Sequence, residues 1–83
     1  MNDYQISIKR LHHSECILEY KDSLGELSIW VDQSPFEEYD YVSTEERIEV
    51  KGERFDQVLK NIQEWAQKED YIIKIWKENE IGI

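Results

Sequence analysis

The sequence is short of cysteine, glycine and proline, and each shortage excludes a class of structure or function. Its 83 residues include a single cysteine, Cys16, so no disulfide can form within the chain, and a reducing compartment is expected. The three glycines, at positions 25, 52 and 82, are too widely spaced for the glycine-rich loops that cradle nucleotide phosphates. With only one proline and no low-complexity tract, nothing divides the chain into separate domains.

Long apolar runs and an excess of positive charge are also missing. No apolar run approaches the ~18 residues needed to cross a bilayer, and the first residues lack the basic and apolar regions of a signal peptide. Nineteen acidic against ten basic side chains give a net charge of −9, which repels phosphates and anionic lipids. We therefore expect a cytoplasmic protein that binds neither nucleic acid nor membrane and that prefers a basic protein partner.

The negative charge is concentrated in one part of the sequence. Between Lys21 and Arg47 there are eight carboxylates and no Lys or Arg, and residues 35–41 alternate acids with three aromatic rings. In a protein interface, carboxylates steer a basic partner and aromatic side chains supply the desolvated anchors. The predicted partner-binding residues are Trp30, Asp32, Phe36, Glu37, Glu38, Tyr39, Asp40 and Tyr41.

Alternation of apolar and polar residues predicts strands at about 4–8, 16–20, 27–31 and 46–50, with a turn at 21–26 between the second and third. A last strand is predicted at 71–76. Because that segment is apolar on both faces, we place it in the centre of the sheet.

Helical periodicity is clear between residues 53 and 68, where the apolar residues that recur on one face are Phe55, Val58, Leu59, Ile62, Trp65 and Ala66. The order β-β-β-loop-β-α-β predicts an α+β fold, with an antiparallel-dominated sheet and one amphipathic helix packed on one of its faces. We expect a single domain over residues 1–83, with a long acidic loop at 32–44 and a tail at 77–83 that frays.

One face of such a sheet has no helix to cover it. Ile17, Trp30, Ile72 and Trp76 are candidates for that face, and large apolar groups there are typical of an interface. For Trp30 and Trp76, the alternatives are a binding interface or packing under the 32–44 loop.

Residues for catalysis or metal binding are sparse. His12 and His13 precede Cys16, which could supply metal ligands or a Cys-His nucleophile, but a solvated turn beside a buried thiol explains the segment equally well. Paired carboxylates such as Glu37-Glu38 are expected by chance in so acidic a chain. We therefore predict no enzymatic activity, no metal site and no cofactor.

The pattern of the whole chain resembles small bacterial immunity proteins, which neutralise polymorphic or contact-dependent toxins. The resemblance comes from the acidic composition, from the strand Leu27-Ser28-Ile29-Trp30-Val31, and from the closing helix and strand at 53–62 and 72–75. It implies a protein that occludes the basic active surface of a cognate toxin, and it assigns no role to individual residues. The alternative is a small housekeeping or regulatory domain that forms a homodimer through its uncovered sheet face or an edge strand.

Overall fold

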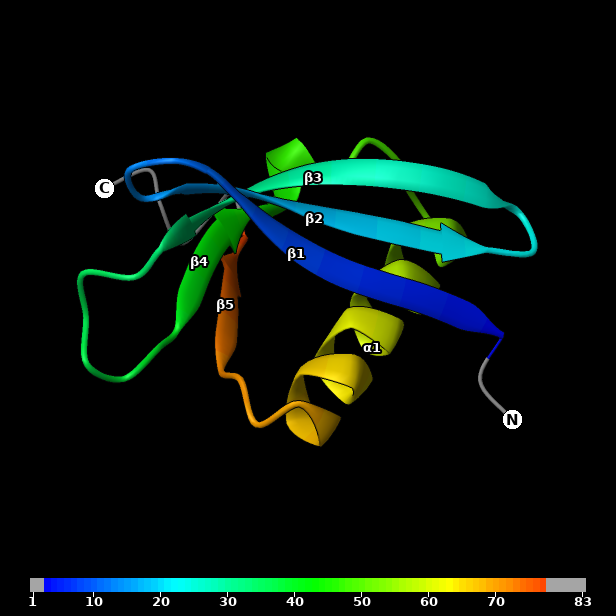
Figure 1. The fold of residues 1–83 in the computed structure, drawn as a ribbon. Coiled ribbons are helices and arrows are strands. Elements are labelled where there is room, and N and C mark those ends of the chain that lie inside the picture. The colour runs from blue at the N-terminus through cyan, green and yellow to red at the C-terminus, as the bar shows by residue number, and fades with distance from the viewer. Residues whose placement is uncertain (1–2, 78–83) are drawn as a thin grey trace.

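The computed structural model describes residues 3–77, which form a five-stranded sheet with one helix against one face (Figure 1). The elements are β1 (Tyr4–His12), β2 (Glu15–Asp22), β3 (Gly25–Gln33), β4 (Tyr41–Thr44), a 3-10 turn (Glu45–Arg47), α1 (Glu53–Lys68) and β5 (Ile73–Trp76). The strands lie in chain order, antiparallel from β1 to β4, and β5 pairs with β4 in parallel. Helix α1 supplies the crossover that a parallel pair requires. The predicted α+β fold is confirmed.

The core lies between α1 and the side of the sheet that faces it. Alternate residues of β2 and β3 point inward, as the sequence pattern predicts, and meet three residues of α1 spaced four apart. The most buried of these side chains are Cys16, Leu18, Tyr20, Ile29, Val31, Val58, Ile62 and Ala66. The helix therefore presents its Val58 side to the sheet, while Leu59, which we expected in the core, is only half-buried.

The predicted strand at 46–50 is wrong, and the strand lies earlier, at Tyr41–Thr44. Tyr41 and Val42 pair with the last residues of β3, which shortens the connection from the predicted 32–44 to residues 34–40. The chain then turns at Glu45, whose carbonyl accepts a hydrogen bond from the Ile48 amide at 3.1 Å. Ile48 is nevertheless buried, and Val50 packs against the core. Their alternation with polar residues therefore reflects contact with the core from an irregular segment and not a strand.

The last strand lies at the edge of the sheet and not in its centre, so that prediction is also wrong. Its inner face is apolar because Ile73 and Ile75 join the core. Its outer face carries Lys74 and Trp76, and Trp76 is covered by the connection between β3 and β4. Ile72, which made the segment look apolar on both sides, precedes the strand and is exposed. Of the predicted frayed tail, only Lys77 lies within the described residues.

Helix α1 ends in a Schellman motif without a glycine. The Tyr71 amide donates to the Ala66 carbonyl at 2.8 Å, and the Asp70 amide donates to the Gln67 carbonyl at 3.3 Å. This geometry requires the left-handed conformation at Asp70, which has a φ of 63°. The Tyr71 ring then packs on Trp65, with ring centroids 5.7 Å apart. The motif directs the chain from the helix back toward the sheet.

Candidate functional site

The face of the sheet opposite α1 carries a row of large side chains. Because side chains alternate between faces, Trp30 and its partner Ile17 on β2 point away from the core, as does Val42 on β4. Trp30 is 47% exposed. A half-exposed indole in the middle of a sheet face is a group that a binding partner could desolvate.

The 34–40 connection is a loop whose two ends are hydrogen-bonded to each other and to Ile72, the residue before β5. The Ser34 amide donates to the Asp40 carbonyl at 3.0 Å, which closes the loop. The Asp40 amide donates to the Ile72 carbonyl at 2.7 Å, and Asp40 Oδ2 accepts from the Ile72 amide at 2.7 Å. Asp40, predicted as a partner-binding residue, therefore anchors the loop to the chain ahead of β5.

Two aromatic side chains of this loop pack on Trp76. Phe36, Tyr39 and Trp76 form a cluster of edge-to-face contacts with ring centroids between 5.9 and 6.4 Å apart. Trp76 and Tyr39 are partly buried by these contacts, whereas Phe36 remains 51% exposed. The two alternatives for the tryptophans thus apply to different residues: Trp76 packs under the loop and Trp30 is exposed.

The predicted carboxylates fall into two groups. Asp32 forms an ion pair with Arg47 at 3.1 Å, and Asp40 is used in the loop, so both contribute to the structure. Glu37 and Glu38 are exposed and make no hydrogen bond or ion pair with any residue between 3 and 77. Only this second pair is available to a partner without breaking an internal contact.

Tyr41 lies on the other side of the sheet from Trp30. It points toward α1, packs against the core, and contacts the Tyr71 ring edge-to-face at 5.4 Å. Burial raises the pKa of its phenol. The structure therefore brings Phe36 and Tyr39 together on Trp76, leaves Trp30 exposed beside Asp32, and places Tyr41 on the opposite side of the sheet.

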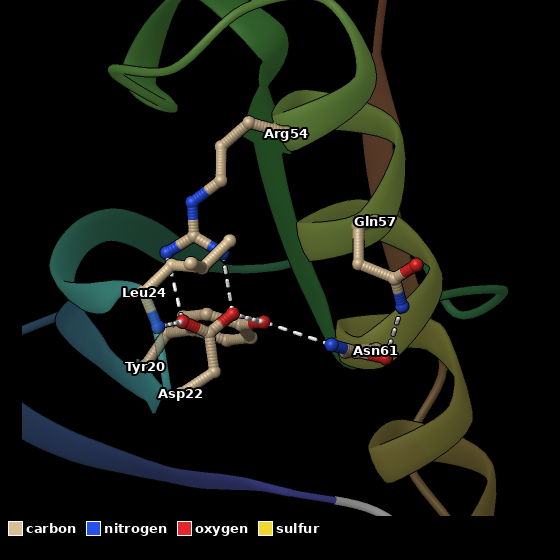
Figure 2. A network of polar contacts seen from close by, with 6 residues as sticks. All are labelled: Tyr20, Asp22, Leu24, Arg54, Gln57 and Asn61. Carbon is tan, nitrogen blue, oxygen red and sulfur yellow. Dashed lines mark hydrogen bonds and ion pairs between the residues drawn. The ribbon is translucent and has the colours of Figure 1, made fainter.

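A polar network that the sequence analysis missed joins the β2–β3 hairpin to the start of α1 (Figure 2). Arg54 donates two hydrogen bonds to the Asp22 carboxylate, at 2.5 and 2.9 Å, and the Tyr20 hydroxyl donates to the same carboxylate at 2.5 Å. The Leu24 amide donates to Asp22 Oδ1 at 2.9 Å, and Asn61 donates to the Tyr20 hydroxyl at 2.8 Å. The carboxylate thus accepts four hydrogen bonds.

This network is internally satisfied, and its groups are occupied with one another. The Arg54 guanidinium holds the pKa of the Asp22 carboxyl well below its usual range, and burial raises the pKa of the Tyr20 phenol. A signal for it existed in the sequence: Tyr20 and Asp22 share a strand face, and Arg54 and Asn61 lie two helical turns apart on one helix face. Its arrangement fits a structural clamp, because the Asp22 carboxylate is already held by four hydrogen bonds and its charge is compensated by Arg54.

The histidines and the cysteine do not converge on a site. The Cys16 side chain is buried on the core side, where burial raises the pKa of its thiol, while His12 and His13 are exposed with ring centroids 3.8 Å apart. Within residues 3–77 no group of three His, Cys, Asp or Glu side chains could hold a metal ion. The solvated-turn interpretation describes this segment.

Comparison with known proteins gives no family for this chain. No protein-family model matches the sequence, and no curated protein or solved structure is significantly similar to it. In the described part of the chain, no helix is both long and apolar enough to cross a bilayer.

Proposed function

We propose that this protein is an acidic protein-binding module, and specifically an immunity protein that neutralises a basic toxin by covering its active surface. The observation that carries the proposal is the uncovered sheet face, where Trp30 is half-exposed, together with the neighbouring loop that presents Phe36. Exposed aromatic anchors beside acidic side chains fit a basic protein surface.

The distribution of charge supports the same partner. The chain carries a net charge of −9, and the Glu37-Glu38 pair at the tip of the loop has no cation of its own among the described residues. Such a surface accelerates the encounter with a positively charged protein and repels nucleic acid. Covering the active surface of a toxin requires no catalysis, and a surface with exposed aromatic side chains and carboxylates is suited to that role.

The experiment begins with a partner recovered from the host, purified, and shown to be both basic and toxic when expressed alone. Co-expression of this protein should restore growth. Phe36→Ala should mainly speed dissociation of the complex, and Glu37→Gln combined with Glu38→Gln should mainly slow association and reduce its salt dependence. Leu24→Ala is the matched control, because Leu24 is 76% exposed but lies in the β2–β3 turn.

A recovered partner that is acidic, or a complex that forms equally well with all these variants, would refute the proposal. The second candidate is a homodimeric housekeeping or regulatory domain, because β1 and β5 are both edge strands of the sheet. Sedimentation equilibrium separates the two. A stable dimer favours the second candidate, and a monomer removes it.

A further inference from the structure

A hollow of about 300 Å³ lies on the uncovered sheet face and is lined by Glu15, Trp30, Asp32 and Arg47. Glu15 and Asp32 are directly opposite one another on β2 and β3, and Trp30 is the next outward-facing residue along β3. Two carboxylates and the exposed indole therefore line one small depression. All three side chains lie outside the hydrophobic core.

The charges in this hollow do not balance. Carboxylates that face each other across an antiparallel pair repel. Arg47 relieves part of this repulsion through its ion pair with Asp32 at 3.1 Å. The Glu15 side chain is exposed and makes no ion pair or hydrogen bond with any other described residue. With two carboxylates and one guanidinium, the hollow carries one uncompensated negative charge.

The Trp30 ring also has no cation against it. Arg47 donates to the Trp30 carbonyl at 3.4 Å and to the Asp32 carboxylate, so its guanidinium is held at the strand backbone. The cation-π contact found among residues 3–77 joins Arg54 to Tyr20, on the opposite side of the sheet. An indole face and a carboxylate are thus both open to a single cation from outside.

We propose that this hollow receives one arginine side chain of the basic protein partner, which stacks on Trp30 and pairs with Glu15. The inference rests on the proposed function and specifies its contact chemistry. Arginine fits better than lysine, because a planar guanidinium lies flat on an indole and presents two donors in the plane of a carboxylate, whereas an ammonium is a compact, strongly hydrated charge.

The test uses the isolated protein and a small probe, so it does not depend on finding a partner. N-acetylarginine methylamide is titrated at low salt while the three tryptophan indole N–H signals are followed by NMR, after assignment with single Trp→Phe variants. The Trp30 signal should shift and saturate, and the Trp65 signal should not move. N-acetyllysine methylamide should bind more weakly.

Glu15→Gln should weaken arginine binding roughly two- to fivefold, the size expected for losing one exposed ion pair. Glu26→Gln is the matched control: it removes the same charge from the same face of the sheet, but four residues along β3 from Trp30, and it should leave the titration unchanged. Thermal unfolding of each variant confirms that the fold is retained.

Three results would overturn the inference: no saturable shift at Trp30, an equal effect of Glu15→Gln and Glu26→Gln, or a Trp30 signal that moves with protein concentration alone. The last result would mean that a second copy of the chain occupies the hollow. A toxin that binds normally to Glu15→Gln would refute this contact while leaving the proposed function intact. Saturable arginine binding by a protein whose recovered partner is not basic would support this contact and refute the proposed function.

Discussion

Replacing Asp22 by Asn should destabilise the protein far more than any other neutralisation of a single carboxylate at its surface. The Asp22 side chain is only 9% exposed, and the Arg54 side chain that pairs with it is 20% exposed. Asn preserves the shape but removes the charge and places an amide N–H₂ group where a carboxylate oxygen accepts hydrogen bonds. The Arg54 guanidinium is then left partly buried without its counter-ion.

Breaking a fully buried ion pair costs about 3 to 5 kcal/mol, and the partial exposure of Arg54 together with the oxygen retained by Asn reduces this. We expect a loss of about 2 to 3 kcal/mol in the free energy of unfolding. For a domain of this length, each kcal/mol lowers Tm by roughly 4 to 8 °C, so Tm should fall by about 10 to 20 °C. Thermal and urea unfolding followed by circular dichroism measure both quantities.

The same ion pair predicts the acid dependence of stability. The folded state depresses the pKa of Asp22, so the native protein holds fewer protons than the unfolded chain as the pH falls below ~4. The stabilisation is therefore fully present above the unfolded pKa and is lost at lower pH. Asp22→Asn should flatten the pH dependence of the unfolding free energy in this range.

The control is Glu38→Gln, which removes the same charge from the exposed 34–40 loop and should change stability by less than ~0.5 kcal/mol. If Asp22→Asn is no more destabilising than this control at neutral pH, the network does not clamp the hairpin to the helix. The structural interpretation of Figure 2 would then be wrong.

Three further changes test other parts of the structure. Asp70→Gly should raise the free energy of unfolding by about 0.5 to 1 kcal/mol in urea titrations, because glycine adopts the left-handed conformation without strain; an unchanged or lower value contradicts the Schellman geometry. Ile62→Ala should lower it by about 2 to 5 kcal/mol, since this side chain is fully buried between α1 and the sheet, and a loss below 1 kcal/mol would place it outside the core. Elemental analysis of protein purified without an affinity tag should find less than one equivalent of zinc, copper or nickel, and stoichiometric metal that disappears in His13→Ala would contradict the solvated-turn interpretation.

The sequence correctly predicted the elements whose apolar pattern comes only from the contact between the helix and the sheet. Leu18 and Tyr20 alternate with polar neighbours because one face of β2 meets α1 and the other meets solvent, and the helical period of α1 has the same origin. The prediction failed where a residue is buried by something other than the helix. Trp76 is covered by a loop, which made an edge strand look central, and Ile48 enters the core from an irregular segment, which made 46–50 look like a strand.

The candidate site was only partly accessible to sequence reasoning. Strand alternation placed Trp30 opposite the core face, and the acidic and aromatic composition singled out Phe36; both side chains are about half-exposed in the structure. The composition could not separate Tyr41 from them, because the face that Tyr41 occupies depends on its pairing with β3 and β5. Nor could it show that Asp40 bonds to the Ile72 amide, a contact between residues 32 positions apart.

The order of strands along the sheet also sets the order in which the chain can assemble during synthesis. β1, β2 and β3 pair with their sequence neighbours, so this meander is complete once the chain has reached Gln33. The helix that covers its apolar face is complete only at Lys68, about 35 residues later, which corresponds to roughly 2 to 7 s at common rates of translation. During that interval the nascent protein presents an uncovered hydrophobic sheet, and the carboxylates between Lys21 and Arg47 give it the negative charge that opposes self-association.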